Sequence, residues 1–290
     1  MTLAAPLTRP EEKPPPSAAR RHVAAQLGFR RGGGRSFLAR QHTPHPFHLT
    51  RPFYLPDDPQ GMATLYLQSS SGGLYGDDDL HLGIALEDAA AAHVTTQAST
   101  IVHAGRGGTT QQSVSLDCAP GSLLEYLPDP LILFTGARLR AKLTVQLAHD
   151  ATLVFADAFL AHDPEAGRQG FDAFENDIVV RRCGEPLPLL IERQRLGKGL
   201  GLAGYACHGS LCVVANDGLE TVAAAMKRQL AESGLAVDAC YGAVNALPER
   251  GYVWARFLCR DGAALSTALD ATWRGARLAL TGRLPAPRRK

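Results

Sequence analysis

Four carboxylates occupy positions in the sequence at which they could bind a cation or transfer a proton. Asp77 and Asp78 lie in a glycine-rich segment, where the backbone bends freely, and Asp157 and Glu192 each interrupt a run typical of a buried strand. Burying an ionised carboxylate is costly unless it is paired or bound to a cation. We expect Asp78, Asp157 and Glu192 to line a polar, water-filled path, where oxygen ligands stop a hydrated divalent ion only transiently.

Two other uses of these carboxylates compete with the ion path. In a pure interaction scaffold, Glu192 would form a structural ion pair with Arg193, Arg195 or Arg138. In a carbohydrate-active enzyme, two carboxylates about 5 to 9 Å apart would act as acid and base. The chain has only two tryptophans, both near its C-terminus, which argues against sugar stacking.

The catalytic and nucleotide-binding motifs that we looked for are either absent or lack the secondary structure that they need. The sequence Gly-Leu-Gly-Leu-Ala-Gly at 199–204 fits the dinucleotide pattern, but a strand rather than a helix is expected after it, so we interpret it as a bend. The glycine-rich segment 105–110 lacks the lysine of a phosphate-binding loop, and neither GxSxG nor HExxH occurs. These motifs therefore predict neither nucleotide hydrolysis nor a nucleophilic serine or zinc-peptidase site.

Histidines and cysteines give two weaker metal candidates. His42, His45 and His48 are separated by prolines that forbid a helix, and we expect them on an exposed edge strand. Cys207 and Cys212 match no zinc spacing and are expected to be buried in a strand. The six dispersed cysteines favour reduced thiols.

The composition limits partners and location. A formal net charge of +2 with dispersed basic residues gives no footprint for nucleic acid. The sequence contains no run of about 18 apolar residues, so it predicts no membrane-spanning helix. Residues 1–20 lack the apolar stretch of a secretory signal. We expect a disordered leader over 1–20 and a cytoplasmic protein.

Alternation of apolar and polar residues dominates the chain from about residue 35 to 215. It predicts a mainly β protein, with a large multi-stranded body resembling a β-solenoid or sandwich over 21–204. The predicted strands are 64–68, 80–86, 93–97, 112–116, 123–127, 143–147, 152–159, 178–182 and 189–195.

The last quarter has a different pattern. Apolar residues at helical spacing follow Asp217 and Asp261, which we expect to cap two helices, and Gly234 should end the first. Strands near 237–244 and 252–259 lie between them. We predict an α-β-β-α subdomain over 205–284 packed on the body, and a basic tail over 285–290.

Five blocks of sequence resemble the urease accessory protein UreD family, also called UreH, in its order and at about its spacing. They are Arg-Pro-Phe-Tyr at 51–54, Gly-Gly-Leu-Tyr-Gly-Asp-Asp at 72–78, Thr-Thr-Gln-Ala-Ser-Thr at 95–100, Leu-Glu-Tyr-Leu-Pro at 124–128 and Ile-Leu-Phe-Thr-Gly-Ala-Arg at 132–138.

The resemblance implies an elongated β fold and a non-enzymatic scaffold or metallochaperone. Such a protein assembles with accessory proteins F and G on apo-urease and assists nickel insertion, with Ni²⁺ bound only in transit. By position, Asp78, Asp157 and Glu192 match family acids.

Three positions depart from the family pattern. Asp77 replaces a glycine, and Ile101 stands where a lysine is usual. Segment 161–167 lacks the family's Gly-Arg-x-x-x-Gly-Glu. If that segment contacts a partner or the ion path, either Glu165 or Asp163 takes over, or the protein is a divergent member with an altered surface.

Overall fold

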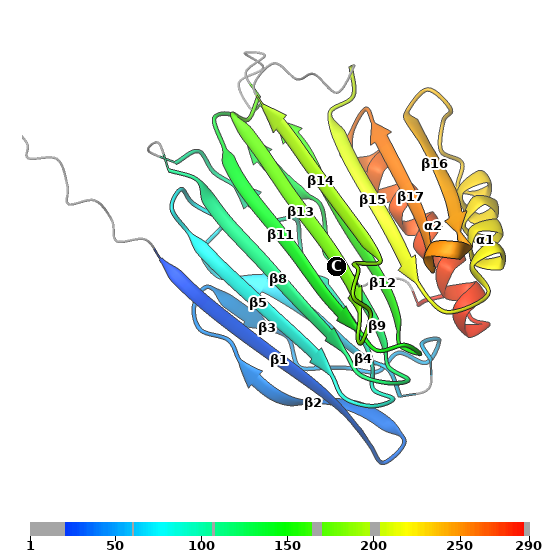
Figure 1. Ribbon diagram of the computed structural model, residues 1–290. Coiled ribbons are helices and arrows are strands. Elements are labelled where there is room, and N and C mark those ends of the chain that lie inside the picture. Colours follow the sequence, from blue (N-terminus) through cyan, green and yellow to red (C-terminus); the bar gives the residue numbers. More distant parts are fainter. Residues whose placement is uncertain (1–20, 60, 106–107, 164–169, 198–203, 287–290) are drawn as a thin grey trace, which may run out of the picture.

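The computed structural model describes residues 21–59, 61–105, 108–163, 170–197 and 204–286. Two β-sheets face each other, and α-helices cover the outer face of one of them (Figure 1). The mainly β prediction is confirmed. The predicted leader 1–20, the segment 199–203 and the tail beyond 286 lie outside the described residues.

Sheet A is in front in Figure 1, and sheet B lies behind it. In order across sheet A, the strands are β14 (Leu190–Gly197), β13 (Ala173–Arg182), β11 (Arg138–Leu147), β8 (Thr110–Cys118), β5 (Asp79–Leu86), β1 (His22–Gly32) and β2 (Arg35–His42). Sheet B contains β16 (Cys240–Leu247), β17 (Tyr252–Cys259), β15 (Cys207–Val214), β12 (Thr152–His162), β9 (Leu123–Leu127), β6 (Ala91–Thr96), β4 (Ala63–Ser69) and β3 (Phe47–Leu49). In addition, β10 (Leu131–Phe134) pairs with β12, and β7 (Ile101–Val102) pairs with β10.

The chain coils between the two sheets as in a solenoid. Strands β5, β8, β11 and β13 pair in parallel with the next coil in sheet A. Strands β4, β6, β9 and β12 do the same in sheet B. Period-two alternation turns one side chain in two towards the facing sheet, so Leu82 and Ile84 of β5 and Val145 of β11 join one buried cluster.

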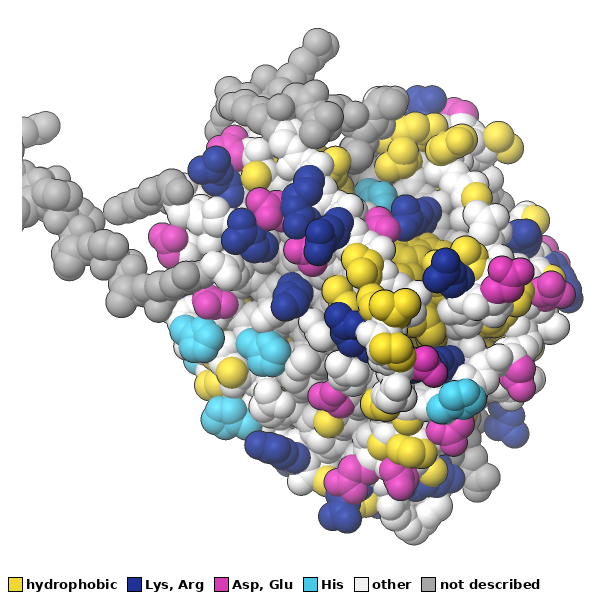
Figure 2. Space-filling model, in the orientation of Figure 1, with side chains coloured by type: hydrophobic (Ala, Val, Ile, Leu, Met, Phe, Trp, Pro, Cys, Tyr) yellow, Lys and Arg dark blue, Asp and Glu magenta, His cyan; other side chains and the backbone are white. Residues whose placement is uncertain are grey.

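The outer face of sheet A is charged. Arg140 of β11 pairs with Glu175 of β13 at 3.1 Å, and Arg195 of β14 pairs with Asp177 at 3.0 Å. Basic and acidic side chains intermingle over this face in Figure 2. These charged pairs keep one face of sheet A in water, whereas sheet B is covered on both faces over most of its strands.

The C-terminal elements extend sheet B. Strands β15, β17 and β16 continue it in antiparallel pairing, and α1 (Leu219–Glu232) and α2 (Gly262–Thr281) pack on its outer face. The predicted α-β-β-α order is confirmed.

The predicted helix caps are only partly correct. The Asp261 carboxylate accepts the Ala264 amide at 2.8 Å, and Gly234, with a left-handed φ of 73°, follows α1, as expected. The Asp217 prediction was wrong. Gly218 is the N-cap, with a φ of 68° and no side-chain cap, because the chain turns into α1 through this left-handed glycine.

The N-terminal hairpin of β1 and β2 was not predicted. Ala25, Leu27 and Phe29 alternate into the core, but the strand directly follows the proline-rich leader and its outward positions are not uniformly polar. Strand β16 also begins at Cys240 rather than near Val237, which is exposed. Both differences lie at the ends of periodic segments, where tertiary pairing decides the boundary.

A buried charge network fastens α2 to sheet B. The Arg277 guanidinium donates to Glu125 Oε1 of β9 at 2.5 Å and to Asp58 Oδ1 at 2.7 Å. Glu125 Oε2 also accepts from Trp273 Nε1 at 3.0 Å and lies 2.7 Å from His93 Nδ1. Burial by itself would raise the pKa of Glu125, but the hydrogen bonds and charge of Arg277 and His93 outweigh it, and the pKa falls to about 2.

Replacing Glu125 by alanine should destabilise the fold by about 3 to 5 kcal/mol, because Arg277 would keep only one of its two carboxylates in a buried site. Urea unfolding followed by circular dichroism measures this. Glu175→Ala, which removes an exposed pair, is the matched control and should leave the midpoint almost unchanged. Equal midpoints for both variants would contradict the structural role of Glu125.

The depressed pKa of Glu125 also predicts a pH dependence. Its folded-state pKa of about 2 lies below the ordinary value of 4.5, so its contribution to stability is complete above pH 4.5 and is lost as pH falls towards 2. The free energy of unfolding of Glu125→Gln should therefore fall less over this window than that of the wild type. Parallel curves from pH 5 to 2 would show that other groups control acid unfolding.

Candidate functional site

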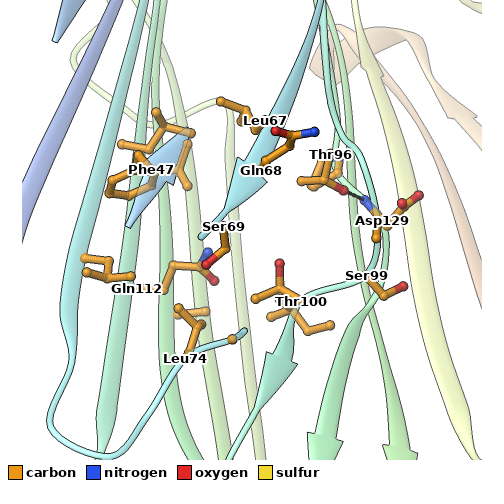
Figure 3. Close-up of a pocket in the computed structure, with 18 of the residues that line it drawn as sticks. Phe47, Leu67, Gln68, Ser69, Leu74, Thr96, Ser99, Thr100, Gln112 and Asp129 are labelled. Atoms are coloured by element: carbon orange, nitrogen blue, oxygen red, sulfur yellow. Dashed lines mark hydrogen bonds between the residues drawn. The ribbon is translucent and has the colours of Figure 1, made fainter. Parts of the chain in front are cut away.

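A cavity of about 480 Å³ lies between the two sheets (Figure 3). It separates two apolar clusters of the interior. Leu82 and Leu143 belong to one cluster, Leu74 and Leu80 belong to the other, and all four line the cavity. The inter-sheet core is thus interrupted at one place.

Most of the cavity wall is apolar, and several uncharged polar side chains are set into it. Gln68 and Thr96 come from sheet B, Gln112 comes from sheet A, and Ser99 and Thr100 come from the loop after β6 (Figure 3). The Asp129 amide donates to Thr96 Oγ1 at 2.8 Å, which fixes the loop after β9 beside the cavity. Such groups can hydrogen-bond water without holding an ion tightly.

Asp157 places an acid in this wall. On β12 it stands between Phe155 and Phe159, which are fully buried and share its face of the strand. Its Oδ2 accepts from Asn176 Nδ2 of sheet A at 2.9 Å. Burial, assisted by the charge of Glu192, raises the pKa of Asp157 to about 6 in spite of the Asn176 hydrogen bond. Among the described residues, the Asn176 hydrogen bond thus does not offset the cost of burying ionised Asp157.

A polar row leads from Asp157 across sheet B. Asp157 is in register with Ser210 of β15, and Ser210 is in register with Arg256 of β17. Because cross-strand partners share a face, all three side chains lie on the inter-sheet side. Arg256 then contacts Glu192 of β14 in sheet A, with its Nη2 2.5 Å from Glu192 Oε2.

Glu192 therefore pairs with Arg256, rather than with Arg193, Arg195 or Arg138. The alternation of side chains along β14 explains why Glu192 pairs with Arg256. Glu192 points towards sheet B, whereas Arg193 and Arg195 point outwards and pair with Asp177. Only one of the three expected acids, Asp157, is among the described residues that line the cavity, and the row joins Glu192 to it.

Asp78 lies elsewhere. Its carboxylate accepts from Arg21 Nε at 2.9 Å and from the Tyr75 amide at 2.9 Å, so it closes the turn before β5. The preceding Asp77 has a φ of 71°, a left-handed conformation that aspartate tolerates better than most residues. This explains how Asp77 can stand where glycine was expected.

The three histidines were predicted to lie on one edge strand, and this prediction was wrong. His42 ends β2 at the edge of sheet A, whereas His48 lies in β3 at the edge of sheet B and lines the cavity. His45 precedes the cis proline between them. Cys207 and Cys212 are buried in β15, as predicted. In the described ranges, no three histidine, cysteine or acidic side chains are grouped to hold a metal.

The replaced segment 161–167 is only partly described. Asp163 Oδ1 lies 3.5 Å from Thr135 Oγ1, and Glu165 falls outside the described residues. Among the helices that the structure describes, none is long and apolar enough to cross a membrane.

Sequence reasoning missed Ser210 and Arg256. The signal was present, since Arg256 interrupts the inward face of β17 between Trp254 and Leu258 as Asp157 does on β12. What the sequence lacked was the register that aligns these strands.

Comparison with known proteins agrees along the whole described chain. A family model described as UreD urease accessory protein matches residues 22–290. Proteins named urease accessory protein UreD 1 are similar in Methylorubrum populi (36% identical, covering 93% of this chain and 92% of the relative), Bradyrhizobium sp. strain BTAi1 (37%, 93% and 95%) and Pseudomonas syringae pathovar tomato (36%, 92% and 95%). With its solenoid body and this match, the chain belongs to the UreD urease accessory protein family.

Proposed function

We propose that this protein is a non-enzymatic accessory factor that assists nickel insertion into apo-urease together with accessory proteins F and G, in the cytoplasm. The single observation that carries the nickel role is the inter-sheet cavity, in which Asp157 is the acid inserted between two buried phenylalanines. A scaffold without cargo would have no need to interrupt its core in this way.

The cavity suits a hydrated ion better than a bare one. Its volume of about 480 Å³ accommodates on the order of ten waters, at roughly 30 Å³ each. Amide and hydroxyl groups of the wall can hydrogen-bond the ion's own water shell, so the ion need not be stripped. Asp157 then supplies one charge at which a divalent cation pauses, and a single carboxylate releases nickel more readily than a thiolate cluster would.

The three acids take different parts in this proposal. Asp157 is the stop inside the cavity, and Glu192 is a second stop at the far end of the polar row. Asp78 holds the turn through Arg21, and it serves the path by shaping the β5 end of sheet A rather than by touching the ion.

A pure docking scaffold is the second candidate function. The observation in its favour is that both Asp78 and Glu192 form ion pairs. It differs from the first candidate in requiring nothing of Asp157 beyond folding.

Asp157→Asn should separate the two functions. The raised pKa means that the folded state disfavours ionised Asp157, so its favourable contribution is present below about pH 4 and lost as pH rises through 6. At pH 7 the neutral amide should therefore raise the free energy of unfolding by roughly 1 to 2 kcal/mol. In cells, the same variant should lower urease activation several-fold.

The control for this experiment is Asp177→Asn, which removes an acid from the exposed face of sheet A and should leave activation unchanged. Co-purification with apo-urease and accessory proteins F and G should be equal for the wild type and both variants. Wild-type activation by Asp157→Asn at equal expression would eliminate the ion path and leave the docking scaffold.

A further inference from the structure

The Glu192–Arg256 ion pair stands at the outer end of the polar row. Arg256 is half exposed at the edge where β14 of sheet A meets β17 of sheet B, and the side chain of Glu192 is only 15% exposed. Moving inwards from the pair, the row passes the buried Ser210 and reaches Asp157 in the cavity wall. One ion pair thus joins β14, the edge strand of sheet A, to β17 of sheet B at the outer end of the polar seam.

Polar atoms beside this seam are buried and unpaired. Gln194 Nε2 lies 3.2 Å from His208 Nε2 across the sheets, but Gln194 Oε1, His208 Nδ1 and Trp254 Nε1 make no hydrogen bond in the described protein. Unpaired buried polar groups are rare in native proteins unless water or a passing solute satisfies them. One acceptor and up to two donors beside the row match the needs of water, which both donates and accepts.

The contacts of Arg256 allow it to leave Glu192 without losing its place. Its guanidinium lies over the Trp254 ring at 4.5 Å from the ring centre, a cation–π contact that does not depend on Glu192. Glu192, in contrast, is fixed by its strand and points inwards, so its carboxylate keeps its place when the guanidinium moves off it.

We propose that Arg256 is a counter-ion gate, which occupies Glu192 until a divalent cation arrives along the row and displaces it. This inference rests on the proposed ion path and adds a residue that regulates it. A cation must compete with the guanidinium for one carboxylate, so Arg256 weakens binding at Glu192 and favours release. The displaced guanidinium stays on Trp254 and can close the seam again.

Nickel titration of the purified full-length chain, followed by isothermal calorimetry, tests the gate. Arg256→Gln removes the competing charge and should tighten Ni²⁺ binding about tenfold, whereas Arg256→Lys, which keeps the charge, should stay near the wild type. Glu192→Gln should weaken binding. Arg193→Gln is the matched control, since Arg193 lies next to Glu192 on the outward face, and should bind as the wild type does.

A measurement on the unaltered chain covers the case in which a variant fails to fold. Phenylglyoxal modifies free guanidinium groups, and mass spectrometry locates the modified residue. Saturating Ni²⁺ should accelerate modification of Arg256 several-fold and leave Arg193 unaffected. An unchanged rate at Arg256, or equal nickel affinity for the wild type and Arg256→Gln, overturns the gate. The path itself is judged separately, because Asp157→Asn can lower activation whether or not Arg256 moves.

Discussion

Sheet B is covered on both faces over most of its strands, and this constraint governs the charged side chains that it buries. Its inner face meets sheet A, and its outer face meets α1 and α2. A charge on either face must therefore be paired, or a cost remains in the folded state. On the outer face Glu125 finds Arg277 of α2, and on the inner face Arg256 finds Glu192 of β14. These two pairs attach sheet B to its neighbours, one on each side.

Asp157 is the member of this set whose pairing is incomplete. Glu125 and Asp157 both lose solvation on sheet B, yet the pKa of Glu125 falls to about 2 and that of Asp157 rises to about 6. The difference lies in the partners, because Glu125 accepts from a guanidinium, whereas the hydrogen bond to Asp157 comes from a neutral amide. A passing cation would complete the pairing at Asp157, whereas at Glu125 the protein has already done so. Asp157 therefore fits the proposed ion path, whereas Glu125 fits a structural role.

The sequence predicted the local pattern well and the long-range register poorly. Period-two alternation located strands such as β5 and β11, and an acid between two phenylalanines identified Asp157, because both signals lie within a few residues. The partner of Glu192 could not be found in this way. Arg256 is far away in sequence, and only the pairing of β12, β15 and β17 aligns it with Asp157. Glu125 also interrupts an apolar strand, since it lies between Leu124 and Tyr126. Its role in a buried ion pair was nevertheless not predicted.

The cavity is a departure from what packing alone would select. Phe155 and Phe159 belong to two different apolar clusters, and an apolar residue at position 157 between them would bury more apolar surface, which favours folding. Instead the interior holds an aspartate with a raised pKa, an adjoining row of polar side chains and unpaired polar atoms at its far end. Each of these lowers the stability of an isolated scaffold. The proposed passage of a hydrated cation would account for their alignment along one line, because the acids of the line could balance its charge and the neutral polar groups could bind its water.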